Sequence, residues 1–303
     1  MPKTYRRRSW RRPLTVLTVL AVLLAVGGYA AYKAYQHYVV QLLTVPGCQA
    51  GTGNNAIPLD FGQAADAATI AGVAVRQHLP RQALAIAYAT ALQEAKLENP
   101  STGDLDSVGI FQQRPSQGWG SAAQLQDPAY AATAFFNALV KVPGYTTLPV
   151  YQAAQDVQRS ADGYAYQQYA QTGAALAAYF TATPHVVTCW YNPATQASSL
   201  GVSGKLDLKG AASGLTDAFG QPGAGNPVRA ISTHTGASGT SGASGTFKVA
   251  AASGWAVADW LVANAGDYGI TQVRYSGYQW TAGLTETSWQ PDSTARAGSI
   301  VAS

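Results

Sequence analysis

Glu94 stands at the end of a stretch that predicts a helix with apolar residues on almost every face, over residues 80–96. The apolar side chains before it are Leu84, Ile86, Tyr88 and Leu92. Burial beside such neighbours and the negative end of a helix both disfavour a charged carboxylate, so they favour the neutral acid. A proton held in this way can be delivered to a glycosidic oxygen. The alternative from the same spacing is an ordinary exposed glutamate in a last helical turn.

An irregular stretch rich in Gly, Gln, Ser and Pro follows this helix over residues 97–126. A compact helical domain does not need about thirty irregular residues unless they have a role. Asp104 and Asp106 lie in this stretch and are candidates to activate a water molecule, if the reaction is a hydrolysis. Their alternative role is that of turn residues whose side chains bond to their own backbone.

Five further side chains could contact a sugar. Gln112 and Gln113 can hydrogen-bond acetamido or hydroxyl groups, with a buried position in a turn as their alternative. Trp119, Tyr164 and Tyr166 can stack on sugar faces, although aromatic residues at these spacings also suit a hydrophobic core.

The order of these residues resembles the lysozyme-like superfamily of goose-type lysozymes and lytic transglycosylases. The similar elements are Glu94 at a helix end, the turn GDLDS at 103–107 and the run GIFQ at 109–112. The next segment, QRPSQGWG at 113–120, resembles a branch of transglycosylase-like wall proteins of high-GC bacteria. The tyrosines of 164–169 resemble the late Tyr-x-x-Tyr helix of the family. The resemblance covers about residues 61–182.

This resemblance implies cleavage of the β-1,4 bond between N-acetylmuramic acid and N-acetylglucosamine in peptidoglycan. Glu94 would protonate the leaving oxygen and then act as a base while a sugar hydroxyl closes a 1,6-anhydro ring. Neither a second carboxylate nor a cofactor is then required. The family places a tyrosine hydroxyl close to the acid, which favours Tyr164 and Tyr166 for this position.

One departure from the family pattern supports a different function. Lytic transglycosylases usually carry serine directly after the catalytic glutamate, and this chain has Ala95. The alternative to an enzyme is therefore a protein that binds peptidoglycan without cutting it, or a scaffold for envelope assembly proteins.

The expected fold class is a mainly α lysozyme-like domain after an N-terminal transmembrane helix, with a small α+β C-terminal module joined by a Gly/Ser-rich linker. The expected segments are a basic cytoplasmic tail (1–12), a transmembrane anchor (13–32), a connector (33–60), the lysozyme-like domain (61–190), the linker (191–246) and the C-terminal module (247–303).

The anchor is predicted from charge and length. Residues 13–32 contain no charge and would span roughly 30 Å as a helix. Because arginines precede this run, the positive-inside rule predicts a cytoplasmic N-terminus and a body outside, as in a single-pass signal-anchored protein of the cell membrane. A cleaved signal peptide is the alternative. Seven of the 19 Lys and Arg residues lie in the first 33 residues, which leaves 12 against 15 acidic residues in the rest. The body therefore has no excess positive charge for a nucleic-acid partner.

The two cysteines, Cys48 and Cys189, are far apart and belong to no C-x-x-C motif. Outside the cytoplasm they would pair with each other or with another chain, and a bridge between them would join the two ends of the 61–190 domain. Two free thiols are the alternative. The four histidines are scattered along the chain, so no metal site is expected.

Overall fold

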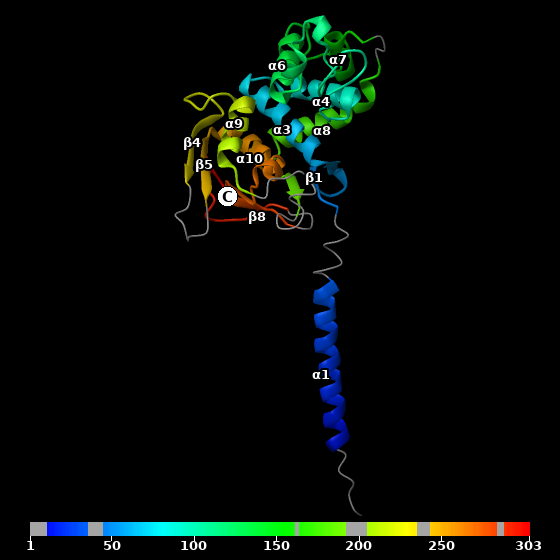
Figure 1. The fold of residues 1–303 in the computed structure, drawn as a ribbon, viewed down its shortest axis with the longest axis vertical. Coiled ribbons are helices and arrows are strands. Elements are labelled where there is room, and N and C mark those ends of the chain that lie inside the picture. The colour runs from blue at the N-terminus through cyan, green and yellow to red at the C-terminus, as the bar shows by residue number, and fades with distance from the viewer. Residues whose placement is uncertain (1–10, 36–44, 161–163, 192–204, 235–242, 284–287) are drawn as a thin grey trace, which may run out of the picture. The chain divides into compact units, whose positions relative to one another are not determined.

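The computed structural model describes residues 11–35, 45–160, 164–191, 205–234, 243–283 and 288–303. The chain divides into two compact units, Met1–Val45 and Pro46–Ser303. Within these described residues, the first unit contains the helix α1 (Arg11–Ala34), and the second contains the other helices and strands (Figure 1).

The expected transmembrane anchor over 13–32 is wrong. Among the described residues, no helix is both long enough and apolar enough to cross a membrane. The apolar run of α1 is interrupted by Gly27, Gly28 and Tyr29. The predicted location in the cell membrane, with the N-terminus in the cytoplasm and the body outside, is wrong for the same reason.

The helices of the second unit begin where local caps place them. The Asp60 carboxylate accepts a hydrogen bond from the Gln63 backbone, and the Gln63 side chain accepts one from the Asp60 backbone, which opens α3. The Asp127 carboxylate caps α6 by accepting hydrogen bonds from the backbone N–H groups of Ala129 and Tyr130, with Pro128 at the first helical position. The helices of this part, which we call the helical half of the unit, are α3 (Phe61–Arg76), α4 (Arg81–Ala95), α5 (Ala122–Leu125), α6 (Pro128–Leu139), α7 (Val150–Gln158) and α8 (Ala170–Thr181).

Helix α4 lies at the centre of this helical half. Its residues Ala83–Ala91 are all buried, and α8 packs closely along it. The close approach depends on Gly173 of α8, since a Cβ there would lie 2.6 Å from the Ala85 carbonyl oxygen and 2.9 Å from the Ala89 nitrogen. Tyr88 completes the packing, with its ring against Phe180. The helix that carries Glu94 is therefore held rigidly from several sides.

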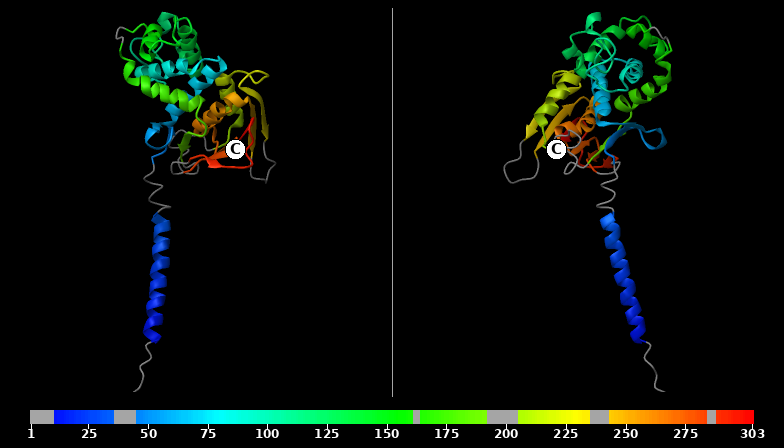
Figure 2. Two further views of the ribbon diagram at one scale, coloured as in Figure 1. Left: turned by 180° about the vertical axis from the view of Figure 1, so that it is seen from behind. Right: turned by 45° about the vertical axis from the view of Figure 1, so that its right-hand side comes forward.

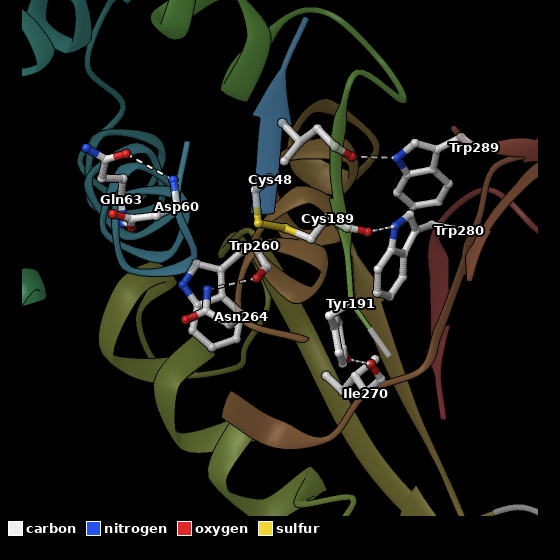
Figure 3. Close-up of a disulfide and its surroundings, with 11 residues drawn as sticks. Cys48, Asp60, Gln63, Cys189, Tyr191, Trp260, Asn264, Ile270, Trp280 and Trp289 are labelled. Carbon is white, nitrogen blue, oxygen red and sulfur yellow. Dashed lines mark hydrogen bonds between the residues drawn. A yellow bond between two sulfur atoms is a disulfide. The ribbon is translucent and has the colours of Figure 1, made fainter. Parts of the chain in front are cut away.

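A three-stranded antiparallel sheet joins the two ends of the helical half, in the order β2 (Ile57–Leu59), β1 (Gly47–Ala50), β3 (Val187–Trp190). Cys48 and Cys189 are opposite each other in the register of β1 and β3, and they form a disulfide (Figure 3). The pairing of the two cysteines predicted from the sequence is thereby confirmed.

The C-terminal part contains a second antiparallel sheet of six strands, in the order β4-β5-β9-β6-β7-β8. Its strands are β4 (Val228–His234), β5 (Ser244–Val249), β6 (Gln272–Tyr275), β7 (Tyr278–Thr281), β8 (Gln290–Pro291) and β9 (Ser299–Ala302). Helices α9 (Leu208–Phe219), α10 (Gly254–Ala263) and α11 (Ala265–Tyr268) accompany it. Figures 1 and 2 show this sheet and its helices on one side of the unit, with α4, α6 and α7 on the other.

The stretch 191–246, expected as a linker, contains α9, the whole of β4 and the first residues of β5. Strand β4 pairs with β5 from Val228 to His234, so the Gly- and Ser-rich composition does not prevent regular structure here. Composition alone could not indicate this, because strand pairing uses backbone groups that glycine and serine also provide.

The C-terminal part packs directly against the helical half and is not a separate module joined only by a linker. The Trp280 and Trp289 indole N–H groups donate to the backbone oxygens of Cys189 and Val187, at 3.1 and 2.9 Å (Figure 3). The Tyr191 hydroxyl donates to the Ile270 oxygen at 2.7 Å. On the other side, the Trp260 indole donates to Thr69 of α3 at 3.1 Å. The expected separate module is thus part of one continuous core with the helices.

Candidate functional site

The site is built at the C-terminal end of α4. The helix ends with two consecutive residues in the left-handed conformation, Lys96 at φ 57° and Leu97 at φ 61°. Non-glycine residues adopt this conformation at a cost of order 1 kcal/mol each, and such strain persists only where the surroundings enforce it. Leu97 is fully buried, and its backbone N–H bonds to the Ala91 oxygen at 3.1 Å, so the chain turns sharply just after Glu94.

Glu94 meets a tyrosine from a distant part of the chain. The hydroxyl of Tyr166 donates to the Glu94 Oε1 atom at 2.6 Å. The Tyr166 side chain is 1 % exposed, whereas Glu94 is half-buried. Among the described residues, no other group hydrogen-bonds to this carboxylate. One oxygen is therefore oriented from the protein interior, and the other has no hydrogen-bond partner among the described residues.

The neighbours of Glu94 tie the same helix end to the short 3-10 helix at Gln167–Tyr169. The Gln168 amide donates to the Gln93 side chain at 3.0 Å. The Lys96 ammonium donates to the Tyr169 hydroxyl at 2.5 Å and lies 4.7 Å from the centre of its ring. Gln93, Lys96 and Gln168 were not anticipated, because polar residues at a helix end carry no signal for partners about 70 positions away.

Asp106 connects two parts of the loop after α4 through hydrogen bonds. Its Oδ1 atom accepts from Arg114 Nε at 2.7 Å, and from Ser116 Oγ at 3.0 Å. Its Oδ2 atom accepts from the Ser116 backbone N–H at 2.8 Å. The hydrogen bond from Arg114, with those from Ser116, lowers the pKa of Asp106 to about 2. Both carboxylate oxygens are thus occupied, and the group holds residues 103–108 against 114–116.

The Gln112 amide is also used within the loop. Its nitrogen donates to the Gly109 carbonyl oxygen at 3.0 Å, and its oxygen accepts from the Ser107 hydroxyl at 3.2 Å. A Cβ at Gly103 would lie 1.8 Å from the Gln112 Oε1 atom, so a larger residue there would displace this amide. The GDLDS turn and the GIFQ run are therefore one interlocked hairpin, closed by a bridge between Val108 and Gln113.

The candidates Gln113, Tyr164 and Trp119 differ in their burial and in the residues that they contact. Gln113 is 2 % exposed and donates to the Ala131 oxygen at 3.3 Å, so it faces α6 rather than solvent. Tyr164 is 68 % exposed and stacks on Tyr151 of α7, with ring centres 5.4 Å apart. Trp119 is half-buried and lines a cavity with residues in and just after the C-terminal ends of α6 and α7.

Asp104 differs from Asp106 in its surroundings. Its side chain is exposed and has no hydrogen-bond partner among the described residues, while its backbone oxygen accepts from Ser107. Of the two aspartates, only Asp104 therefore has a carboxylate that a water molecule or ligand could approach freely.

The arrangement suits proton transfer by a single carboxyl group. Glu94 is oriented by one strong hydrogen bond and otherwise open, which is the condition for a general acid that later acts as a base. In the part of the chain that the structure describes, no group of three or more His, Cys, Asp or Glu side chains is arranged to hold a metal ion.

No protein-family model matches this chain, and no curated protein matches it. The resemblance to the lysozyme-like superfamily therefore rests on the residues between Glu94 and Gly120, and on the tyrosines of 164–169.

Proposed function

We propose that this protein cleaves peptidoglycan glycan strands at the β-1,4 bond between N-acetylmuramic acid and N-acetylglucosamine, with Glu94 as the acid and base. The observation that carries this proposal is the 2.6 Å hydrogen bond from Tyr166 to Glu94. It fixes one carboxyl oxygen of a half-buried glutamate and leaves the other for a glycosidic oxygen. The residue order of the interlocked loop that follows resembles that of lytic transglycosylases.

The proton transfers follow from this geometry. In its neutral form, Glu94 gives its proton to the glycosidic oxygen as the C–O bond breaks, so the leaving sugar departs as an alcohol. The resulting carboxylate then takes a proton from the hydroxyl that attacks the oxocarbenium-like centre. Tyr166 keeps donating its hydrogen bond throughout, and this interaction is strongest when Glu94 is charged.

The contacts of the two aspartates bear on the choice between an intramolecular attack and hydrolysis. A hydrolase needs a second carboxylate to activate water or to act as nucleophile. Asp106 cannot easily do so, because its two oxygens accept three hydrogen bonds from Arg114 and Ser116. If Glu94 acts alone, the sugar's own hydroxyl is the attacking group and the product carries a 1,6-anhydro end. Asp104 is the candidate partner if water attacks instead.

The decisive experiment compares wild type, Glu94→Gln and Glu98→Gln on purified peptidoglycan, with mass spectrometry of the soluble products. Glu98 is an exposed glutamate four residues further on and serves as the matched control. We expect products from wild type and Glu98→Gln and none from Glu94→Gln. Anhydro ends and reducing ends differ by one water, so the same spectra decide between the two outcomes. Equal release from wild type and Glu94→Gln would refute the proposed role of Glu94.

A non-catalytic peptidoglycan-binding or envelope-assembly role is the second candidate, and Ala95 is the observation that favours it. A hydroxyl next to the acid would offer another hydrogen bond in the site, and alanine offers none. This candidate predicts that the protein co-sediments with insoluble peptidoglycan and releases no soluble product. Any turnover that depends on Glu94 would exclude it.

A further inference from the structure

A cavity of about 730 Å³ lies between the ends of α6 and α7 and the loop around Trp119. Cavities of about 300–1,000 Å³ are typical of sites for small ligands. Its walls include Trp119 and Val142, and its charged lining residues are Lys141, Asp156 and Arg159. Figure 1 shows α6 and α7 at the end of the unit away from the six-stranded sheet.

The charges on the lining favour an anionic group. Lys141 and Arg159 are both exposed, and neither forms an ion pair with any residue that the structure describes. Asp156 is the one acidic residue on the lining, so the cavity carries a net positive charge. In addition, an arginine side chain has two parallel N–H donors that match the planar geometry of a carboxylate.

Trp119 differs from the tryptophans of the core. Trp260, Trp280 and Trp289 each donate their indole N–H to a protein oxygen, and each is at most 5 % exposed. Trp119 is half-buried, and its indole N–H has no partner among the described residues. An amphipathic ring with an unused donor in a cavity wall can stack on a sugar face and bond one of its oxygens.

The Trp119 wall is also fixed to the loop that follows Glu94. Arg114 and Ser116 are clamped by Asp106, and the Gln158 amide at the end of α7 donates to the Phe111 oxygen at 2.8 Å. The cavity is therefore built from the same interlocked loop as the candidate catalytic site, although Glu94 is not among its lining residues.

We infer that this cavity binds the N-acetylmuramyl unit of a glycan strand, with the sugar face on Trp119 and its lactyl carboxylate on Arg159 and Lys141. This inference rests on the proposed function for the identity of the polymer. Muramic acid is the sugar of that polymer that carries a carboxylate, whereas N-acetylglucosamine is neutral. The cavity would thus set which sugar of the alternating strand occupies this position.

A simpler explanation for the positions of Lys141 and Arg159 is an interaction with the helix dipoles. Lys141 and Arg159 follow the C-terminal ends of α6 and α7, where a positive side chain stabilises the helix dipole. That account predicts a change in protein stability when either is neutralised, and no change in ligand preference. Binding to two closely matched sugars separates the two accounts.

The test uses the full chain with Glu94→Gln, so that no turnover occurs, and titrates it with N-acetylmuramic acid and with N-acetylglucosamine. These sugars differ in the lactyl group, and their affinities are compared by tryptophan fluorescence and by ligand-observed NMR. We expect the acidic sugar to bind about fivefold more tightly at low salt, and this preference to vanish in Arg159→Gln and to weaken in Lys141→Gln. Arg81→Gln, an exposed arginine outside the cavity, is the control and should keep the preference.

Trp119→Phe keeps an aromatic ring but removes the indole donor, and it should weaken the binding of both sugars without changing their ratio. Equal affinity for the two sugars in the parent protein would overturn the inference, as would an unchanged ratio in Arg159→Gln. Failure of the proposed function has a different signature, since wild type would release no muropeptides from peptidoglycan whatever the sugar preference.

Discussion

At the scale of single residues, the two acids that carry the site differ in what their oxygens contact. Glu94 accepts one hydrogen bond, from Tyr166, and remains half-exposed. Asp106 accepts three, from Arg114 and Ser116, which keep it ionised and in place. The number of occupied oxygens therefore separates the proposed acid, Glu94, from Asp106 more clearly than the residue types do.

Tyr166→Phe tests the positioning of Glu94. Removal of a hydrogen bond to a charged group costs about 1.5–3 kcal/mol, so we expect kcat on soluble glycan substrates to fall about 10- to 100-fold with a smaller change in KM. Tyr164→Phe is the matched control, because Tyr164 is 68 % exposed and stacks on Tyr151. An equal loss in both variants, or none in Tyr166→Phe, would contradict the assignment of Tyr166.

At the scale of elements, the site depends on the close contact between α4 and α8. Tyr166 and Tyr169 stand just before α8, and they reach Glu94 and Lys96 only because α8 lies directly on α4. Gly173 permits that approach, since backbone atoms of α4 occupy the space of a side chain. The geometry of the acid is thus set by the packing distance of two helices.

Gly173→Ala should separate the two helices. The new methyl group would lie 2.6 Å from the Ala85 oxygen, and overpacking of this kind costs about 1–3 kcal/mol. We expect a lower urea midpoint and a parallel loss of peptidoglycan cleavage. The control is Gly62→Ala in α3, where the nearest atom is 3.4 Å away and alanine should raise stability slightly. A Gly173→Ala protein as stable and active as wild type would show that the contact is not essential.

At the scale of the whole molecule, buried acids lie where α3 meets the C-terminal helices. Asp66 of α3 is 8 % exposed, and burial, together with the charges of Asp60 and Asp267, raises its pKa to about 8. Asp259 of α10 is fully buried, and burial raises its pKa well above the ordinary value. These groups are accommodated as neutral acids, which links the packing of the two parts to pH.

Asp66 makes the free energy of unfolding depend on pH. In the unfolded chain this carboxyl ionises near pH 3.8, whereas in the folded protein it keeps its proton to about pH 8. The folded state binds more protons in this window, so the free energy of unfolding falls as the pH rises from about 4 to 8. Asp66→Asn should remove this part of the slope and stabilise the protein at pH 8 by on the order of a few kcal/mol.

Urea unfolding at pH 5 and pH 8 measures this effect. Asp104→Asn is the control, because its exposed side chain has no partner among the described residues and should leave the slope unchanged. A slope in Asp66→Asn identical to that of wild type would rule out Asp66 as its source.

The disulfide acts on the whole second unit, since it links residues 141 positions apart. For a loop of this length, the chain-entropy model predicts a stabilisation of about 4–5 kcal/mol. A double variant with Cys48→Ser and Cys189→Ser should lose about this much in urea unfolding, and reduction of wild type should reproduce the loss. Reductant should have no effect on the double variant. Equal stability of the variant and the oxidised wild type would contradict this account.

The sequence by itself determined the features that depend on neighbours along the chain. The apolar run before Glu94 and the glycines of the following turn are local signals, and α4 and the loop after it lie where these signals indicate. The prediction over 13–32 also used local composition, but among the described residues no helix is both long and apolar enough to cross a membrane.

Only the tertiary structure decided which distant residues meet. It selected Tyr166 rather than Tyr164 as the partner of Glu94, 72 positions away, and it assigned Arg114 to Asp106. It also placed the C-terminal tryptophans on β3, so that 247–303 shares one core with the helices. The physical reason is that such contacts depend on how the whole chain closes, whereas caps and periodicity depend on residues within a few positions of each other.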